Sequence, residues 1–155
     1  MIGYLMILAL LMITLCGASA AAMDTTATSD GPDLSSPRAA IAAKDYVKAA
    51  TELKPIAESS GHPDAYSLLG FALRKSGQPD QAALYYNKAL ELDPVHKATL
   101  EYQGELFVEL GQLDNAKQNL AKLDQICTVP CEEAEDLKEA IEVRPPPSRS
   151  ERRAI

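Results

Sequence analysis

The chain has 155 residues, enough for one modest domain, and carries a formal net charge of −7. Residues 23–143 hold 11 Lys and Arg against 21 Asp and Glu, whereas residues 144–155 hold four Arg and one Glu. An acidic body argues against nucleic-acid binding, which requires a basic surface to displace counterions. The sequence also contains no nucleotide-binding loop, zinc-binding helix or nucleophile motif. We therefore expect neither an enzyme nor a bound cofactor.

The first 22 residues have the pattern of a secretory signal peptide. Residues 2–15 are uncharged and largely apolar, and small residues follow at 17–22. This pattern predicts cleavage after Ala20 or Ala22 and export, with a bacterial periplasm as the expected location. The alternative is an uncleaved membrane anchor, since the apolar run with its small-residue tail approaches the ~20 residues of a membrane span. Contact with a membrane is expected only in that second case.

A polar segment separates this signal from the predicted helical domain at 36–143. Residues 23–35 are rich in helix-breaking residues and are predicted to form a disordered linker. Ser36-Pro37 then resembles a helix N-cap followed by proline in the first turn. The first helical unit, residues 36–62, is predicted to be degenerate, because Pro55 interrupts its second helix. An interior proline costs ~3 kcal/mol unless the helix bends.

The next two segments, residues 63–96 and 97–130, repeat each other with a period of 34 residues. The matched pairs are Gly70 and Gly104, Gly77 and Gly111, Gln78 and Gln112, Asp80 and Asp114, and Ala82 and Ala116. This period is typical of stacked helix-turn-helix units, each too small to bury its own apolar face. Such arrays present surfaces to other molecules, so the period itself favours a binding role.

A capping helix at 131–143 and a basic tail at 144–155 complete the chain. The apolar residues of the cap fall on one helical stripe, namely Ala134, Leu137, Ala140 and Ile141. Acidic residues crowd its first turns, where the helix dipole favours negative charge. The Pro/Arg tail is predicted to be disordered. Its arginines could touch an anionic surface, although charges in such a segment are more commonly just solvated.

Cys127 and Cys131 are left as an even pair once the signal segment, which contains Cys16, is removed. In an oxidising compartment we expect them to form a disulfide that fixes the angle of the cap. The alternative is a redox or copper site, because a three-residue spacer lets two thiolates converge on one soft metal ion. No third ligand is evident, so we expect no bound metal.

The segment 63–96 carries a family signature. The residues at the signature spacing are Tyr66, Leu69, Gly70, Leu73, Ala82, Tyr86, Ala89 and Pro94. They resemble the tetratricopeptide repeat, and the resemblance extends more weakly over residues 38–130. It implies an all-α, right-handed solenoid of about three helical pairs plus a capping helix. The signature residues are packing residues; Gly70 and Ala82 are small because two helices cross closely there. Gln103 departs from the signature, which has leucine at that position.

The resemblance also implies a binding face. Solenoids of this family bind peptides or helices along the concave face lined by the first helix of each unit. The corresponding residues here are Ser67, Phe71, Arg74, Lys75, Glu101, Glu105, Val108 and Glu109. The three glutamates are four residues apart and form one acidic stripe. The stripe either attracts a basic or amino-terminal segment of a partner or is simply a solvated face.

Two further positions on this face bear on the partner. Some family members clamp the carboxylate end of heat-shock chaperones with Lys and Asn, but the matching positions here hold Ser67, Phe71, Glu101 and Glu105. That class of partner is therefore not expected. Phe71 either projects into the groove as an anchor for a partner or is half-buried between units.

The sequence thus predicts an exported scaffold or adaptor that binds another protein and assists the assembly or localisation of an envelope protein. The rival hypothesis is a thiol-redox or copper-handling accessory protein that works through Cys127 and Cys131. His62 and His96 lie one period apart at unit junctions. Equivalent positions of packed units are ~10 Å apart, which is too far for both to hold one ion, so we interpret them as turn residues.

Overall fold

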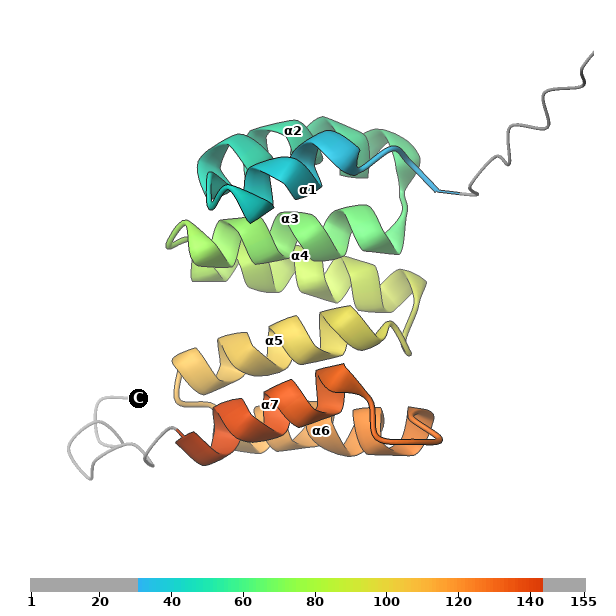
Figure 1. Cartoon of the computed structure of the whole chain (residues 1–155), viewed down its shortest axis with the longest axis vertical. Coiled ribbons are helices and arrows are strands. Elements are labelled where there is room, and N and C mark those ends of the chain that lie inside the picture. The colour runs from blue at the N-terminus through green and yellow to red at the C-terminus, as the bar shows by residue number, and fades with distance from the viewer. Residues whose placement is uncertain (1–30, 144–155) are drawn as a thin grey trace, which may run out of the picture.

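The computed structural model describes residues 31–143, which form seven α-helices and, within that range, no strand (Figure 1). The helices are α1 (Ser35–Ala42), α2 (Tyr46–Ser60), α3 (Pro63–Lys75), α4 (Pro79–Leu92), α5 (Lys97–Glu109), α6 (Leu113–Ile126) and α7 (Glu132–Val143). They pack in sequence as the pairs α1–α2, α3–α4 and α5–α6, and α7 lies against α5 and α6. The predicted all-α stack of helical pairs with a terminal helix is confirmed.

Several predicted segments lie outside the described residues. These are the signal segment 1–22, residues 23–30 of the linker and the tail 144–155. Between residues 31 and 143, no helix is long and apolar enough to cross a membrane.

Helix α2 runs without a break through Pro55, so the predicted interruption there is wrong. Asp45 caps the start of the helix, and its side chain accepts a hydrogen bond from the Lys48 backbone amide (3.1 Å). Pro55 lies on the exposed side, whereas Ala49, Leu53 and Ala57 form a fully buried stripe on the opposite side. Burial of that stripe outweighs the one backbone hydrogen bond that proline cannot make, since tertiary packing supplies most helical stability.

The repeated Gly-Gln dipeptide has one structural role in both units, the turn between the paired helices. Gly77 and Gly111 adopt positive φ angles of 81° and 74°, which glycine reaches without steric cost. The backbone amide of Gln78 donates to the Leu73 carbonyl (2.9 Å), and the backbone amide of Gln112 donates to the Phe107 carbonyl (2.8 Å). These bonds satisfy carbonyls that the end of an α-helix leaves free. The sequence period is therefore a period of identical turns.

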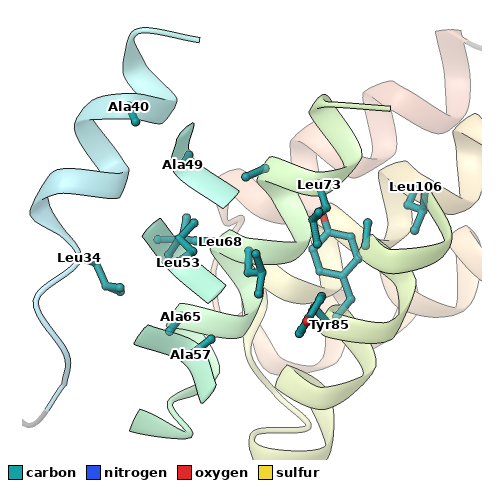
Figure 2. Packing of buried hydrophobic residues seen from close by; sticks show 14 residues of the cluster. Leu34, Ala40, Ala49, Leu53, Ala57, Ala65, Leu68, Leu73, Tyr85 and Leu106 are labelled. Carbon is teal, nitrogen blue, oxygen red and sulfur yellow. The ribbon is translucent and has the colours of Figure 1, made fainter. Parts of the chain in front are cut away.

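The buried apolar residues form two clusters. The larger one spans α1 to α4, and Figure 2 shows its residues from Leu34, just before α1, and Ala40 of α1 to Tyr85 of α4, together with Leu106 of α5. The smaller one joins Leu100 and Leu123 to Ala134 and Leu137 of α7. Helix α5 contributes to both clusters, so it connects the two parts of the stack.

Gly70 and Gly104 mark the closest helix contacts, but with different neighbours. A Cβ atom on Gly70 would lie 2.6 Å from two ring carbons of Tyr86 and 3.2 Å from the Ala82 carbonyl oxygen, within the same unit. A Cβ atom on Gly104 would lie 2.5 Å from the Leu137 side chain on α7. The close crossing predicted at Gly70 and Ala82 is present. At Gly104 the repeat position instead accommodates the cap.

We expect Gly70→Val to lower the free energy of unfolding by about 1–3 kcal/mol, because overpacking a rigid, fully buried ring costs that much. The measurement is urea unfolding followed by circular dichroism. Gly77→Val is a comparison of a different kind, since no atom lies within 4 Å of a Cβ there and only the positive φ opposes it. A Gly70→Val protein with the unfolding midpoint of the native chain would contradict the close crossing.

Candidate partner-binding face

Helices α3, α5 and α7 lie side by side on one face of the stack (Figure 1). We call this surface the α3–α5–α7 face. All eight residues proposed from the repeat signature belong to its first two helices: Ser67, Phe71, Arg74 and Lys75 to α3, and Glu101, Glu105, Val108 and Glu109 to α5. These residues differ in how far they are exposed. Ser67, Arg74 and Val108 are buried, Phe71, Glu101 and Glu105 are half-buried, and Lys75 and Glu109 are exposed.

Arg74 is a buried cation that joins the second unit to the third. Its guanidinium is bonded to both Glu105 and Glu109, with Nη1 2.6 Å from Glu109 Oε1. Burial works against the charged form, but Tyr86 and the two glutamates outweigh it, and the pKa of Arg74 is raised. Two of the three stripe glutamates are therefore engaged by the protein's own arginine. This pairing reduces the negative charge available to a partner.

Phe71 lies in an aromatic group between units. Its ring is 4.8 Å from the Tyr102 ring and meets the Tyr46 ring edge-on at 6.1 Å. The Arg74 guanidinium and the Lys75 ammonium each lie 5.6 Å from its centroid. The ring is thus half-buried between units rather than projecting freely. Its remaining exposed part still presents an aromatic surface on this face.

A groove between α5 and α7 extends this face towards the carboxyl end of the domain. It has a volume of about 320 Å³ and is lined by Glu105, Asp136, Glu139, Ala140 and Val143. We call it the α5–α7 groove. The acidic residues of α7 were expected only to complement the helix dipole. Their place beside α5 depends on how the cap docks, which no sequence pattern specifies.

Glu101 lies where burial and negative neighbours both act on its carboxyl group. Burial raises the pKa of its carboxyl group to about 8, and Glu105, Asp136 and Glu133 add to the increase. In the unfolded chain the pKa is about 4.5, the ordinary value for glutamate. Between these two values the folded protein holds a proton that the unfolded chain has lost. The contribution of Glu101 to stability is therefore complete below pH ~4.5 and is lost as the pH rises through ~8.

We expect Glu101→Gln to raise the melting temperature at pH 8.5 more than at pH 5, because glutamine removes the cost of ionising a half-buried carboxyl group. Thermal unfolding of the variant and the native protein at both pH values measures this difference. Glu91→Gln, at an exposed position on α4, is the matched control and should show no such dependence. A shift that is the same at both pH values would rule out the raised pKa.

Both histidines cap helices, as their interpretation as turn residues predicts. His62 Nδ1 accepts from the Asp64 amide at the start of α3, and His96 Nδ1 lies 2.7 Å from Thr99 Oγ1 at the start of α5. His96 Nε2 also lies 2.7 Å from Asp64 Oδ1, which ties the two helix starts together. Within residues 31–143, no group of three His, Cys, Asp or Glu residues is placed to hold a metal ion.

Cys127 and Cys131 form the predicted disulfide. It closes the turn between α6 and α7, and Cys131 also packs against the smaller apolar cluster. A second pocket, about 400 Å³ in volume, borders the bridge and includes Val129 and Lys138. The bridge therefore sets the start of the cap helix and leaves the turn itself exposed.

Comparison with known proteins identifies one segment of the chain. Residues 63–96, which contain α3, α4 and the turn between them, match the family model of the tetratricopeptide repeat. No curated protein is similar enough to the chain to count as a match. The chain therefore contains a tetratricopeptide repeat within an all-α stack, and a domain of this kind implies a protein partner in general.

Proposed function

We propose that this chain is an exported scaffold or adaptor that binds a segment of another protein on its α3–α5–α7 face. Its role would be in the assembly or localisation of an envelope protein. The observation that carries the proposal is the tetratricopeptide repeat at residues 63–96 within a stack of helical pairs. Repeats of this kind stack to build extended binding surfaces.

The chemistry of the face narrows the partner segment. Phe71 and Tyr102 offer a half-open aromatic surface, and Asp136 and Glu139 add negative charge on the same face. A segment with an apolar anchor and neighbouring basic residues complements both features. A partner that presents a terminal carboxylate is disfavoured, since the acids of this face would repel it.

Export is proposed from two features that agree. The first 22 residues have the pattern of a secretory signal, and disulfides such as Cys127–Cys131 persist in oxidising compartments. Mass spectrometry of the mature protein would reveal whether the chain begins after Ala20 or Ala22 or keeps its apolar segment.

The test of binding is capture of partners from envelope extracts with the full chain and with two variants. Phe71→Ala removes the aromatic surface, and Leu84→Ala removes an exposed apolar side chain of α4, away from the α3–α5–α7 face. We expect Phe71→Ala to lose the captured protein and Leu84→Ala to retain it, with helix content unchanged in both. Equal capture by both variants would mean that the partner binds a different surface.

The disulfide supports a second candidate function, a thiol-redox or copper-handling accessory, because its turn is exposed beside a pocket. For the adaptor we expect Cys127→Ser/Cys131→Ser to lose about 2 kcal/mol of stability, the chain-entropy value for so short a loop. Denaturant unfolding measures that loss, and partner capture should be unchanged. Stoichiometric Cu(I) uptake by the reduced native protein, together with loss of capture in the variant, would favour the accessory role instead.

A further inference from the structure

The α5–α7 groove has carboxylates without partners in the described structure. Within residues 31–143, neither Asp136 nor Glu139 takes part in an ion pair or a side-chain hydrogen bond. Glu105 is bonded to Arg74 from the α3 side and also lines the groove. The groove therefore has room for a cation on its α7 side.

Apolar surface lies at one end of the same groove. Val143 is 73% exposed, the largest exposed fraction among the large apolar side chains of the described residues, and Ala140 lies one turn before it. The groove thus combines acidic side chains with an uncovered apolar end. An occupant that fits it needs both positive charge and apolar groups.

The segment that directly follows Val143 has this composition. Residues 144–155 read Arg-Pro-Pro-Pro-Ser-Arg-Ser-Glu-Arg-Arg-Ala-Ile, with four arginines against one glutamate. Three consecutive prolines cannot extend α7, so the chain can change direction there. Twelve residues in an extended polyproline-like form span ~37 Å. That reach exceeds the ~20 Å length of a 13-residue helix such as α5.

We propose that the basic tail, residues 144–155, folds back and docks in the α5–α7 groove of its own chain. Its arginines pair with Asp136 and Glu139, and its prolines cover Val143 and Ala140. Arginine suits this role because its planar fork bonds carboxylates with two donors. This contact goes beyond the proposed adaptor function and does not depend on a foreign partner.

The covalent tether makes this contact feasible although each ion pair is weak. Exposed ion pairs contribute only ~0–1 kcal/mol each. A segment attached at the rim of its own site has an effective concentration in the millimolar range, so a few such pairs are sufficient. The contact should weaken in salt, which screens exposed charges. It should also lower the pKa of Glu101, because added positive charge favours the ionised carboxyl group.

The experiment compares the amide NMR spectra of the native full chain and of a tail variant. Both are recorded in a neutral detergent at about 20 mM NaCl, where screening is weak. The test variant replaces Arg144, Arg149, Arg152 and Arg153 with glutamine. We expect chemical shifts on α5, around Tyr102 and Glu105, to change along with those of α7. The Glu101 titration midpoint should rise in the variant, and both effects should disappear in about 0.5 M NaCl.

Two double variants, one in the groove and one elsewhere, keep the test specific. Asp136→Asn/Glu139→Gln should shift the tail amides, whereas Glu58→Gln/Glu91→Gln should leave them unchanged. The second pair makes the same change in net charge at exposed positions on α2 and α4. The proposal is overturned if the arginine variant alters only the tail and the last turn of α7, or if shifts spread evenly over the stack. Shifts that grow with protein concentration would overturn it as well, because the tail would then occupy a second copy.

Discussion

Replacing Arg74 with methionine should lower the free energy of unfolding by about 3 kcal/mol, near the lower end of the range for breaking a buried ion pair. Only 2% of the arginine side chain is exposed, so its partners lose a cation that water does not replace in the same place. Glu105 and Glu109 are 28% and 50% exposed and can partly rehydrate, which places the loss at the lower end. Methionine keeps most of the side-chain volume, so little of the loss comes from a cavity. Urea unfolding measures the change.

Two companion variants separate charge from packing at this site. Arg74→Lys should retain part of the stability, since it keeps the charge without the two-pronged geometry. Arg74→Met/Glu105→Gln/Glu109→Gln should recover most of the loss, because the two carboxylates that lose their cation are then replaced by neutral amides. If the triple variant is as unstable as Arg74→Met, the loss of the ion pairs does not explain the destabilisation.

Leu137→Ala should cost about 3 kcal/mol, within the 2–5 kcal/mol found for fully buried leucines. Leu137 is completely buried, belongs to the smaller apolar cluster and lies directly over Gly104. Its loss leaves a hole under the cap, and α7 should lose its amide-exchange protection before the other helices. Leu84→Ala, at a side chain that is 52% exposed, is the matched control and should change stability little.

The geometry at Gly104 adds a second, sharper expectation. An alanine methyl group at residue 104 would occupy the position that the Leu137 side chain fills, only 2.5 Å away. Gly104→Ala should therefore destabilise the native protein but stabilise Leu137→Ala, a coupling measurable by a double-mutant cycle. Additive effects of the two substitutions would mean that α7 does not pack on α5 as described.

The period of 34 residues was sufficient to predict the helical pairs, and the family resemblance added the close crossing at Gly70. The helical pairs depend on local sequence that is repeated along the chain. Pro55 misled the prediction because the cost of a proline is local, whereas the burial of Ala49, Leu53 and Ala57 is a tertiary effect.

The site was predicted less completely than the fold. The family pattern correctly assigned Arg74 and Glu105 to neighbouring helices of one face, but it offered them to a partner, whereas they bond to each other. The groove residues Asp136 and Glu139 were missed because they face α5 only after the cap has docked. Gln103, noted as a departure from the family pattern, donates to Asn87 (2.8 Å) and accepts from Asn119 (3.0 Å). A buried amide thus replaces leucine because polar partners surround it on α4 and α6.

The hydrogen-bonded side-chain amides of Asn87, Gln103 and Asn119 lie where the two apolar clusters approach each other across α5. A boundary with buried polar bonds gives less hydrophobic resistance to separation than the interior of either cluster. We therefore expect the molecule to melt in two stages rather than as one block. The part built on α6 and α7 should detach first, leaving α1 to α4 folded around the repeat. The third unit and its cap would then act as a hinged arm whose opening energy is set by these side-chain amides, the Arg74 ion pairs and the contact between Phe71 and Tyr102.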